Sequence, residues 1–190
     1  MIAVKSISDH RNVDVHFLER DMTIEECRII CNSRKIPLRE KLFFRMIYET
    51  LLQPSEVLNL QIENWDRKYA VVKATRVMMR TRPLKGNMSK KVWLQMRPKT
   101  RSISSNTDKI LIKYVKNKKK GPIFVNNQTG EMISLTWFNK AINRYATLLG
   151  IQKIKKYFKD EVQRDKPRNL KLVTLMALKR AGERDQKIKR

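Results

Sequence analysis

The sequence predicts a single, mostly helical α+β domain with a small antiparallel sheet. Apolar residues recur at helical spacing in several long stretches, whereas β-rich runs surround a Gly-Asn turn between residues 69 and 96. With 190 residues, of which 41% are hydrophobic, the chain can bury a sizeable core. We expect an N-terminal arm or strand over residues 1–21, the main domain over 22–182 and a charged C-terminal end over 183–190.

The first helix is predicted from a capping box. Thr23 and Glu26 have the Thr-x-x-Glu spacing, and an apolar stripe follows that ends near Pro37. Cys27 and Cys31 lie on this stripe. Two thiols on adjacent turns could hold a metal, but no second Cys/His pair with zinc spacing is present, which favours core packing. We therefore expect neither a metal nor a cofactor.

The next two helices are predicted to meet at a tight corner. Apolar residues at helical spacing lead up to Tyr48, the pattern breaks at Gln53-Pro54, and Ser55 stands where a new helix would start. Two or three short antiparallel strands are then expected around the turn Lys85-Gly86-Asn87.

Three further helices are predicted in the second half of the chain. Asn106 or Thr107 can cap the first of them, and Ser134 can cap a strong helix that runs to Leu149, with Gly150 as its C′ residue. The last helix follows from its apolar periodicity, and Gly182 is predicted to end it as a glycine cap.

The charge of the chain points to a polyanion. The sequence has 43 Lys+Arg against 18 Asp+Glu, a formal net charge of +25, and the basic residues are spread along nearly the whole length. This distribution favours a nucleic-acid-binding surface over a basic tail. A solvated positive surface without a partner is the alternative, and a membrane-surface helix is not favoured because no aromatic-rich apolar face lies opposite a basic one.

The corner resembles the first active-site box of the tyrosine recombinases, also called phage integrases. That box reads Tyr-x-Thr-Gly-Leu-Arg-x-Ser-Glu-x-x-x-Leu, with an Asp a few residues on. The residues that match it here are Tyr48, Thr50, Leu52, Ser55, Glu56, Leu60 and Asp66. Leu51 stands at the position of the Gly, and Gln53 stands at that of the catalytic Arg.

The stretch from Pro167 to Gly182 is similar, without a gap, to the second box of the family, Pro-His-x-Leu-Arg-His-Thr-x-Ala-x-x-Leu-x-x-x-Gly. Here Arg168 replaces the first His, Lys171 replaces the Arg and Leu172 replaces the second His. None of the tyrosines lies after Gly182, so the family's nucleophile is not expected in this sequence.

The turn at Lys85 resembles the hairpin in which the family carries a proton-donating lysine, and a plain solvated turn is the alternative. Strand exchange also needs two guanidinium groups that grip the phosphate, together with proton donors. Gln53 is uncharged, Lys171 lacks the planar fork of arginine and Leu172 can neither donate nor accept a proton. The resemblance therefore implies a degenerate catalytic domain.

The expected function is DNA binding without catalysis, with Gln53, Lys85, Arg168 and Lys171 at the phosphate backbone. Two alternatives stay open: an active strand transferase whose nucleophile comes in trans, and an RNA-binding or assembly protein that reuses the fold. Arg168 and Lys171 could also pair with acids such as Glu56 and serve stability.

Duplex DNA is the expected partner, and a second copy of the chain or a partner recombinase is a further candidate. No membrane partner is expected, because no run of apolar residues approaches the length of a membrane span. The same observation, with charged residues near the N-terminus, predicts a cytoplasmic protein.

Overall fold

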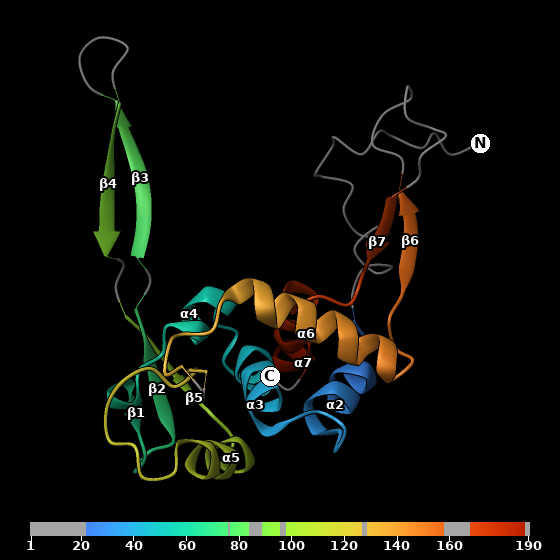
Figure 1. Ribbon diagram of the computed structural model, residues 1–190, viewed down its shortest axis with the longest axis horizontal. Helices are drawn as coiled ribbons and strands as arrows, with labels where there is room; N and C mark the ends of the chain where they lie inside the picture. The colour runs from blue at the N-terminus through green and yellow to red at the C-terminus, as the bar shows by residue number, and fades with distance from the viewer. Residues whose placement is uncertain are drawn as a thin grey trace.

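The computed structural model describes residues 22–75, 77–83, 89–95, 98–126, 129–157 and 168–188. The predicted fold class is confirmed: helices form a central body, and short antiparallel strands lie at its edges (Figure 1). The predicted arm at 1–21 lies outside the described residues. Within the described part, no helix has both the length and the apolar character that crossing a bilayer requires.

The helices follow the predicted order. They are α2 (Ile24–Asn32), α3 (Leu38–Thr50), α4 (Pro54–Leu58), the 3₁₀ turn η1 (Ile62–Asn64), α5 (Ser105–Val115), α6 (Leu135–Leu148) and α7 (Leu175–Ile188). The capping box of α2 is confirmed, since Thr23 N donates to Glu26 Oε2 and Glu26 N donates to Thr23 Oγ1. The cap of α6 is also confirmed: Trp137 N donates to the side chain of Ser134, and Gly150 beyond the helix has φ +70°.

Two predicted helix ends were wrong. Ser104, rather than Asn106 or Thr107, caps α5, because its hydroxyl accepts from Thr107 N at 3.2 Å. Helix α7 does not end at Gly182 but runs on to Ile188. Residues 183–188 of the predicted charged end therefore continue the last helix of the body.

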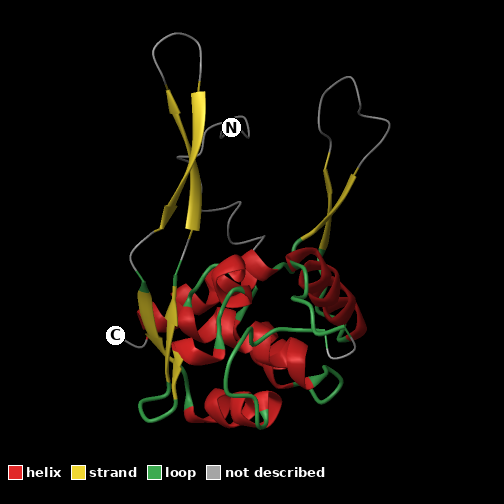
Figure 2. Cartoon of the chain, turned by 60° about the vertical axis from the view of Figure 1, so that its left-hand side comes forward, coloured by secondary structure: helices red, strands yellow, loops and turns green. Residues whose placement is uncertain are grey.

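The strands form three separate antiparallel sheets in the described part of the chain, where one small sheet had been predicted. The first contains β1 (Trp65–Asp66), β2 (Val71–Ala74) and β5 (Lys99–Ser102), and the others are two-stranded hairpins. These are β3 (Val77–Pro83) with β4 (Ser89–Gln95), and β6 (Ile154–Tyr157) with β7 (Arg168–Lys171). Figures 1 and 2 show both hairpins rising from the same side of the helical body.

The core is built around α3. Phe43 stacks on Phe138 with 3.7 Å between ring centroids and meets Phe124 edge-on at 5.1 Å, so that α3 and α6 share one aromatic cluster. The predicted core packing of Cys27 and Cys31 is confirmed, because both thiols are buried. Burial also raises the pKa of the Cys31 thiol far above its ordinary value, which keeps it protonated and unreactive.

Candidate nucleic-acid interface

The two sequence boxes meet where α7 crosses the end of α3. A Cβ added to Gly182 would lie 2.2 Å from the backbone oxygen of Tyr48 and 3.0 Å from Leu51 Cδ2. Real Cβ atoms do not approach a carbonyl oxygen so closely, so only glycine allows this contact. Gly182 is therefore a packing residue in the interior of α7 and not a helix cap.

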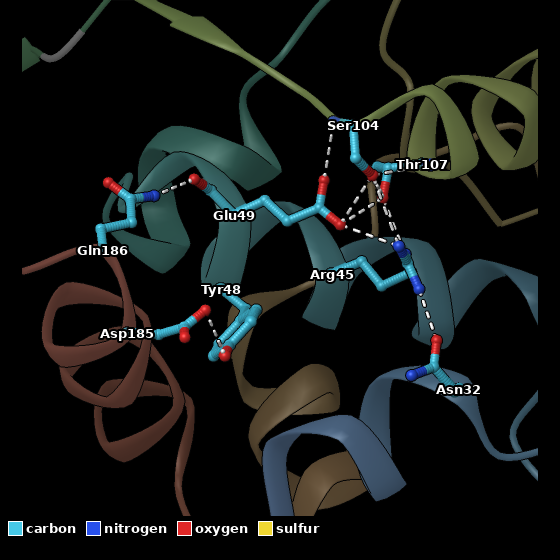
Figure 3. A network of polar contacts seen from close by, with 8 residues as sticks. All are labelled: Asn32, Arg45, Tyr48, Glu49, Ser104, Thr107, Asp185 and Gln186. Carbon is cyan, nitrogen blue, oxygen red and sulfur yellow. Dashed lines mark hydrogen bonds and ion pairs between the residues drawn. The ribbon is translucent and has the colours of Figure 1, made fainter. Parts of the chain in front are cut away.

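Two side-chain hydrogen bonds hold the same junction (Figure 3). Tyr48 Oη donates to Asp185 Oδ2 at 3.0 Å, and Gln186 Nε2 donates to the backbone oxygen of Glu49 at 2.7 Å. Burial, and then the bond to Asp185, raises the pKa of the Tyr48 phenol above its ordinary range. The phenol is therefore a protonated donor that joins α3 to α7.

The corner after α3 is formed by Leu51, which stands at the glycine position of the first box. Leu51 ends α3 with φ 58° and ψ 16°, a left-handed conformation that favours glycine. Gln53 N then donates to Glu56 Oε2 at 2.7 Å, which caps α4. The other carboxylate oxygen of Glu56 accepts from Lys99 Nζ at 3.0 Å. Glu56 thus pairs with Lys99, and no hydrogen bond or ion pair in the described part joins it to Lys171.

The left-handed backbone conformation of Leu51 allows a direct test of this corner. Leu51→Gly and Leu51→Ala both lose the leucine side chain, but only glycine adopts this backbone conformation without a steric penalty. We expect the Gly variant to be more stable than the Ala variant by about 1 kcal/mol in urea unfolding. Lys109→Gly and Lys109→Ala, at an exposed position of α5, are the matched control. There the Ala variant should be the more stable one, because alanine is favoured inside a helix by roughly 1 kcal/mol. An Ala variant at residue 51 that matches or exceeds the Gly variant would contradict the described corner.

Sequence reasoning missed a buried polar network behind the corner (Figure 3). The guanidinium of Arg45 donates to Glu49 Oε1 at 2.8 Å, to Thr107 Oγ1 at 2.7 Å and to Asn32 Oδ1 at 2.6 Å. Glu49 in turn accepts from Ser104 N at 3.0 Å. This network fixes α3 against α2 and the start of α5. Its sequence signal is an Arg and a Glu four residues apart in a helix, which is also the signal of a solvent-exposed pair.

The strands of both hairpins carry several basic residues. The β3–β4 hairpin carries Arg80, Arg82, Lys90 and Lys91, the β6–β7 hairpin carries Lys155, Lys156, Arg168 and Lys171, and neither set of strands has an acidic residue. Because both hairpins rise from one side of the body, these charges belong to two arms on that side (Figure 2). The basic residues of these strands are therefore divided between two projections of the backbone.

The candidate site residues have different positions relative to these arms. Lys171 ends β7 and is exposed, whereas Leu172 is half-buried and its backbone N donates to Lys153 O at 2.9 Å. Arg168 begins β7, where its backbone pairs with that of Tyr157. Lys85 lies outside the described residues, in the connection between β3 and β4. Among the described residues no hydrogen bond or ion pair links Gln53 to Lys171, so their convergence on one phosphate stays a prediction.

Comparison with solved structures identifies the fold. The chain is similar to the XerA recombinase, with a TM-score of 0.58 and 14% sequence identity over 87% of this chain and 49% of that one. It is also similar to the Tn1549 transposon integrase in complex with a circular intermediate DNA, with a TM-score of 0.54, 11% identity and coverage of 85% and 51%. A third match is the XerH site-specific recombinase bound to its difH substrate, with a TM-score of 0.54, 15% identity and coverage of 90% and 43%.

These matches show a fold of the tyrosine recombinase type at low sequence identity. The chain spans about half the length of the recombinase chains that it matches. No family model matches the sequence, and no curated protein does.

Proposed function

We propose that this protein binds duplex DNA through its phosphate backbone and does not cleave it. The observation that carries the proposal is the pair of basic hairpins on one side of a recombinase-like body. Two of the similar structures, the Tn1549 integrase and XerH, are complexes with DNA, which supports the same class of ligand here. The net charge of +25 supplies the long-range attraction that such binding needs.

The loss of cleavage rests on the residues that replace the family's reagents. Gln53 places an uncharged amide where a guanidinium would stabilise the transition state, and its backbone is held in the cap of α4. Lys171 offers a point charge without the bidentate geometry of arginine, and Leu172 cannot transfer a proton. These side chains can bind or border a phosphodiester, but they cannot stabilise its cleavage.

We expect binding to be independent of DNA sequence and to weaken steeply with salt. Each neutralised phosphate contributes about 0.9 to the slope of log affinity against log salt, so six contacts imply roughly a thousandfold loss between 50 and 200 mM salt. Gel-shift titrations with two unrelated duplexes would measure this slope.

The double variant Arg168→Ala/Lys171→Ala should reduce the slope by about 2, because two phosphate contacts are lost.

The matched control removes equal charge from α5 and the loop that follows it. Lys109 on α5 and Lys119 in the following loop are exposed and belong to neither hairpin, so Lys109→Ala/Lys119→Ala should leave the slope nearly unchanged. A flat salt response, or equal effects of the two double variants, would contradict the proposal. Preferential binding of duplex RNA of the same sequence would instead favour the RNA-binding alternative. Incubation with a suicide DNA substrate, followed by denaturation, tests catalysis. A covalent protein–DNA adduct that survives denaturation would show a working enzyme.

A further inference from the structure

The β6–β7 hairpin is connected to the body by two short segments, an entry segment (residues 149–153) before β6 and an exit segment (residues 172–174) after β7. Figure 1 shows that the hairpin leaves the body where α6 ends. The entry segment folds back on α6, because Ile151 N and Gln152 N donate to Ala146 O at 3.0 and 3.1 Å. The exit segment enters the core at Val173, which is 1% exposed. Both segments therefore fix the base of the hairpin to the body.

The side chain of Gln152 joins the exit segment to α6. Its Oε1 accepts from Val173 N at 3.0 Å, and its Nε2 donates to Asn143 Oδ1 at 3.0 Å. A backbone N–H can only donate, so the amide oxygen of Gln152 faces Val173 and its NH2 group faces Asn143. Asn143 Nδ2 in turn donates to Asn139 O at 2.8 Å, which leaves the Asn143 oxygen for Gln152. Gln152 is half-buried, and both ends of its amide are in use.

Lys153 supports the same connection. Its backbone oxygen accepts from Leu172 N at 2.9 Å, and its Nζ lies 2.8 Å from Glu26 Oε1 of α2. The Lys153 side chain is 43% exposed, so water weakens this ion pair, and its charge is already matched by Glu26. Lys153 is therefore a support of the hairpin and is not counted among the phosphate-binding residues.

These connections decide where the basic residues of β7 lie. Lys171 is exposed, its backbone pairs with that of Ile154, and it stands two residues before Val173. Arg168 is at the other end of the same strand. A backbone that is fixed before binding lowers the conformational entropy that is lost when long basic side chains meet a phosphate.

We propose that Gln152 is a positioning residue of the DNA-binding surface, whose amide holds β7 where Lys171 and Arg168 reach the phosphate backbone. This inference rests on the proposed function. The position requires an acceptor for Val173 N and a donor for Asn143 Oδ1 on one side chain, which an amide provides and an apolar or singly charged side chain does not.

The test is Gln152→Met, which nearly keeps the length of the side chain and removes both hydrogen bonds. In the gel-shift titrations between 50 and 200 mM salt, we expect the slope of log affinity against log salt to fall by about 1 to 2, because each lost phosphate contact contributes about 0.9. In the Arg168→Ala/Lys171→Ala background the same substitution should not change the slope further, since the contacts that Gln152 positions are already absent.

Gln186→Met is the matched control. Gln186 is also half-buried, and its Nε2 donates to a backbone oxygen, that of Glu49, at 2.7 Å, but this bond joins α7 to α3 and not to a hairpin. Gln186→Met should lower Tm by a similar amount and leave the salt slope unchanged. Equal effects of the two methionine variants on the slope would show that a loss of stability is sufficient, and would overturn the positioning role.

A second variant tests the connection from the side of α6. Asn143→Leu removes the acceptor of Gln152 Nε2 at a half-buried helical position, so it should lower the slope in the same direction as Gln152→Met. Asn139→Leu, at an exposed position one turn earlier, should not lower it. If Gln152→Met does not fold, as judged by circular dichroism, the two leucine variants decide, and equal slopes for them would overturn the proposal.

The failure of this inference differs from the failure of the proposed function. A natural chain whose DNA affinity does not change with salt would overturn both. If Arg168→Ala/Lys171→Ala lowers the slope but folded Gln152→Met keeps the natural one, DNA binding by the hairpin stands and only the role of Gln152 is overturned. The same holds if Gln152→Met lowers the slope equally in the natural and the Arg168→Ala/Lys171→Ala backgrounds.

Discussion

Gly182→Ala is expected to lower the free energy of unfolding by about 3 kcal/mol or more, which for a chain of this size shifts Tm by roughly 6–12 °C. The added methyl group would lie 2.2 Å from the backbone oxygen of Tyr48. This oxygen belongs to the last turns of α3 and cannot rotate away as a flexible side chain could, so α3 and α7 must separate. Helix propensity alone predicts the opposite sign, because alanine is favoured over glycine inside a helix by roughly 1 kcal/mol.

The control for this substitution is Gly150→Ala. Gly150 has φ +70° and no atom within 4 Å of an added Cβ, so alanine there meets only backbone strain, about 1 kcal/mol. Thermal unfolding of both variants by circular dichroism measures the difference. A Gly182→Ala variant as stable as the natural chain would show that α7 does not pack on the end of α3 as described.

Gly182 also shows why the sequence predicted the helix but not its end. A glycine near the end of an apolar periodic stretch is the usual sign of a helix cap, and it is equally the sign of a close helix crossing. The two cases differ only in the presence of a neighbouring chain segment. Here that segment is Tyr48, which is 134 positions away and therefore outside any local pattern.

The β6–β7 hairpin was missed for a different reason. Its strands, Ile154–Tyr157 and Arg168–Lys171, are short and half of their residues are charged, so they lack the alternation of apolar and polar residues that marks a half-buried strand. Their regular structure comes from pairing with each other. Helices α2 and α6 were predictable because Thr23 and Ser134 provide their own local caps.

The sequence predicted the fold around the two boxes better than it predicted the chemistry of the site. In the first box, the matching residues Thr50, Leu52, Glu56 and Leu60 are all buried, whereas the replaced position, Gln53, is half-buried. In the second box, the replacement Lys171 is exposed. Ser55 and Asp66, which also match the first box, are exposed, so burial accounts for only part of the resemblance.

Arg45→Met is expected to destabilise the protein by about 3–5 kcal/mol, the cost of leaving a buried charge without its partner. Arg45 is 8% exposed and donates to Glu49, Thr107 and Asn32, so its loss removes contacts from α3 to both α2 and α5. Glu49 would keep its hydrogen bonds from Ser104 but would lose its only cationic partner in the described network. Methionine preserves most of the volume, so the effect reports charge and hydrogen bonding more than packing.

A double-mutant cycle with Glu49→Gln separates the pair from its surroundings. Because the two groups share one network, the double variant should be less destabilised than the sum of the single variants, by roughly 0.5–3 kcal/mol. The exposed pair Arg28 and Glu25, whose nearest charged atoms are 3.6 Å apart on α2, is the control. Arg28→Met there should change stability by less than about 1 kcal/mol, because water already solvates both charges. Urea unfolding measures all of these variants. Similar small effects at Arg45 and Arg28 would mean that solvent reaches the Arg45 network, and that α3 is held against α5 by apolar contacts alone.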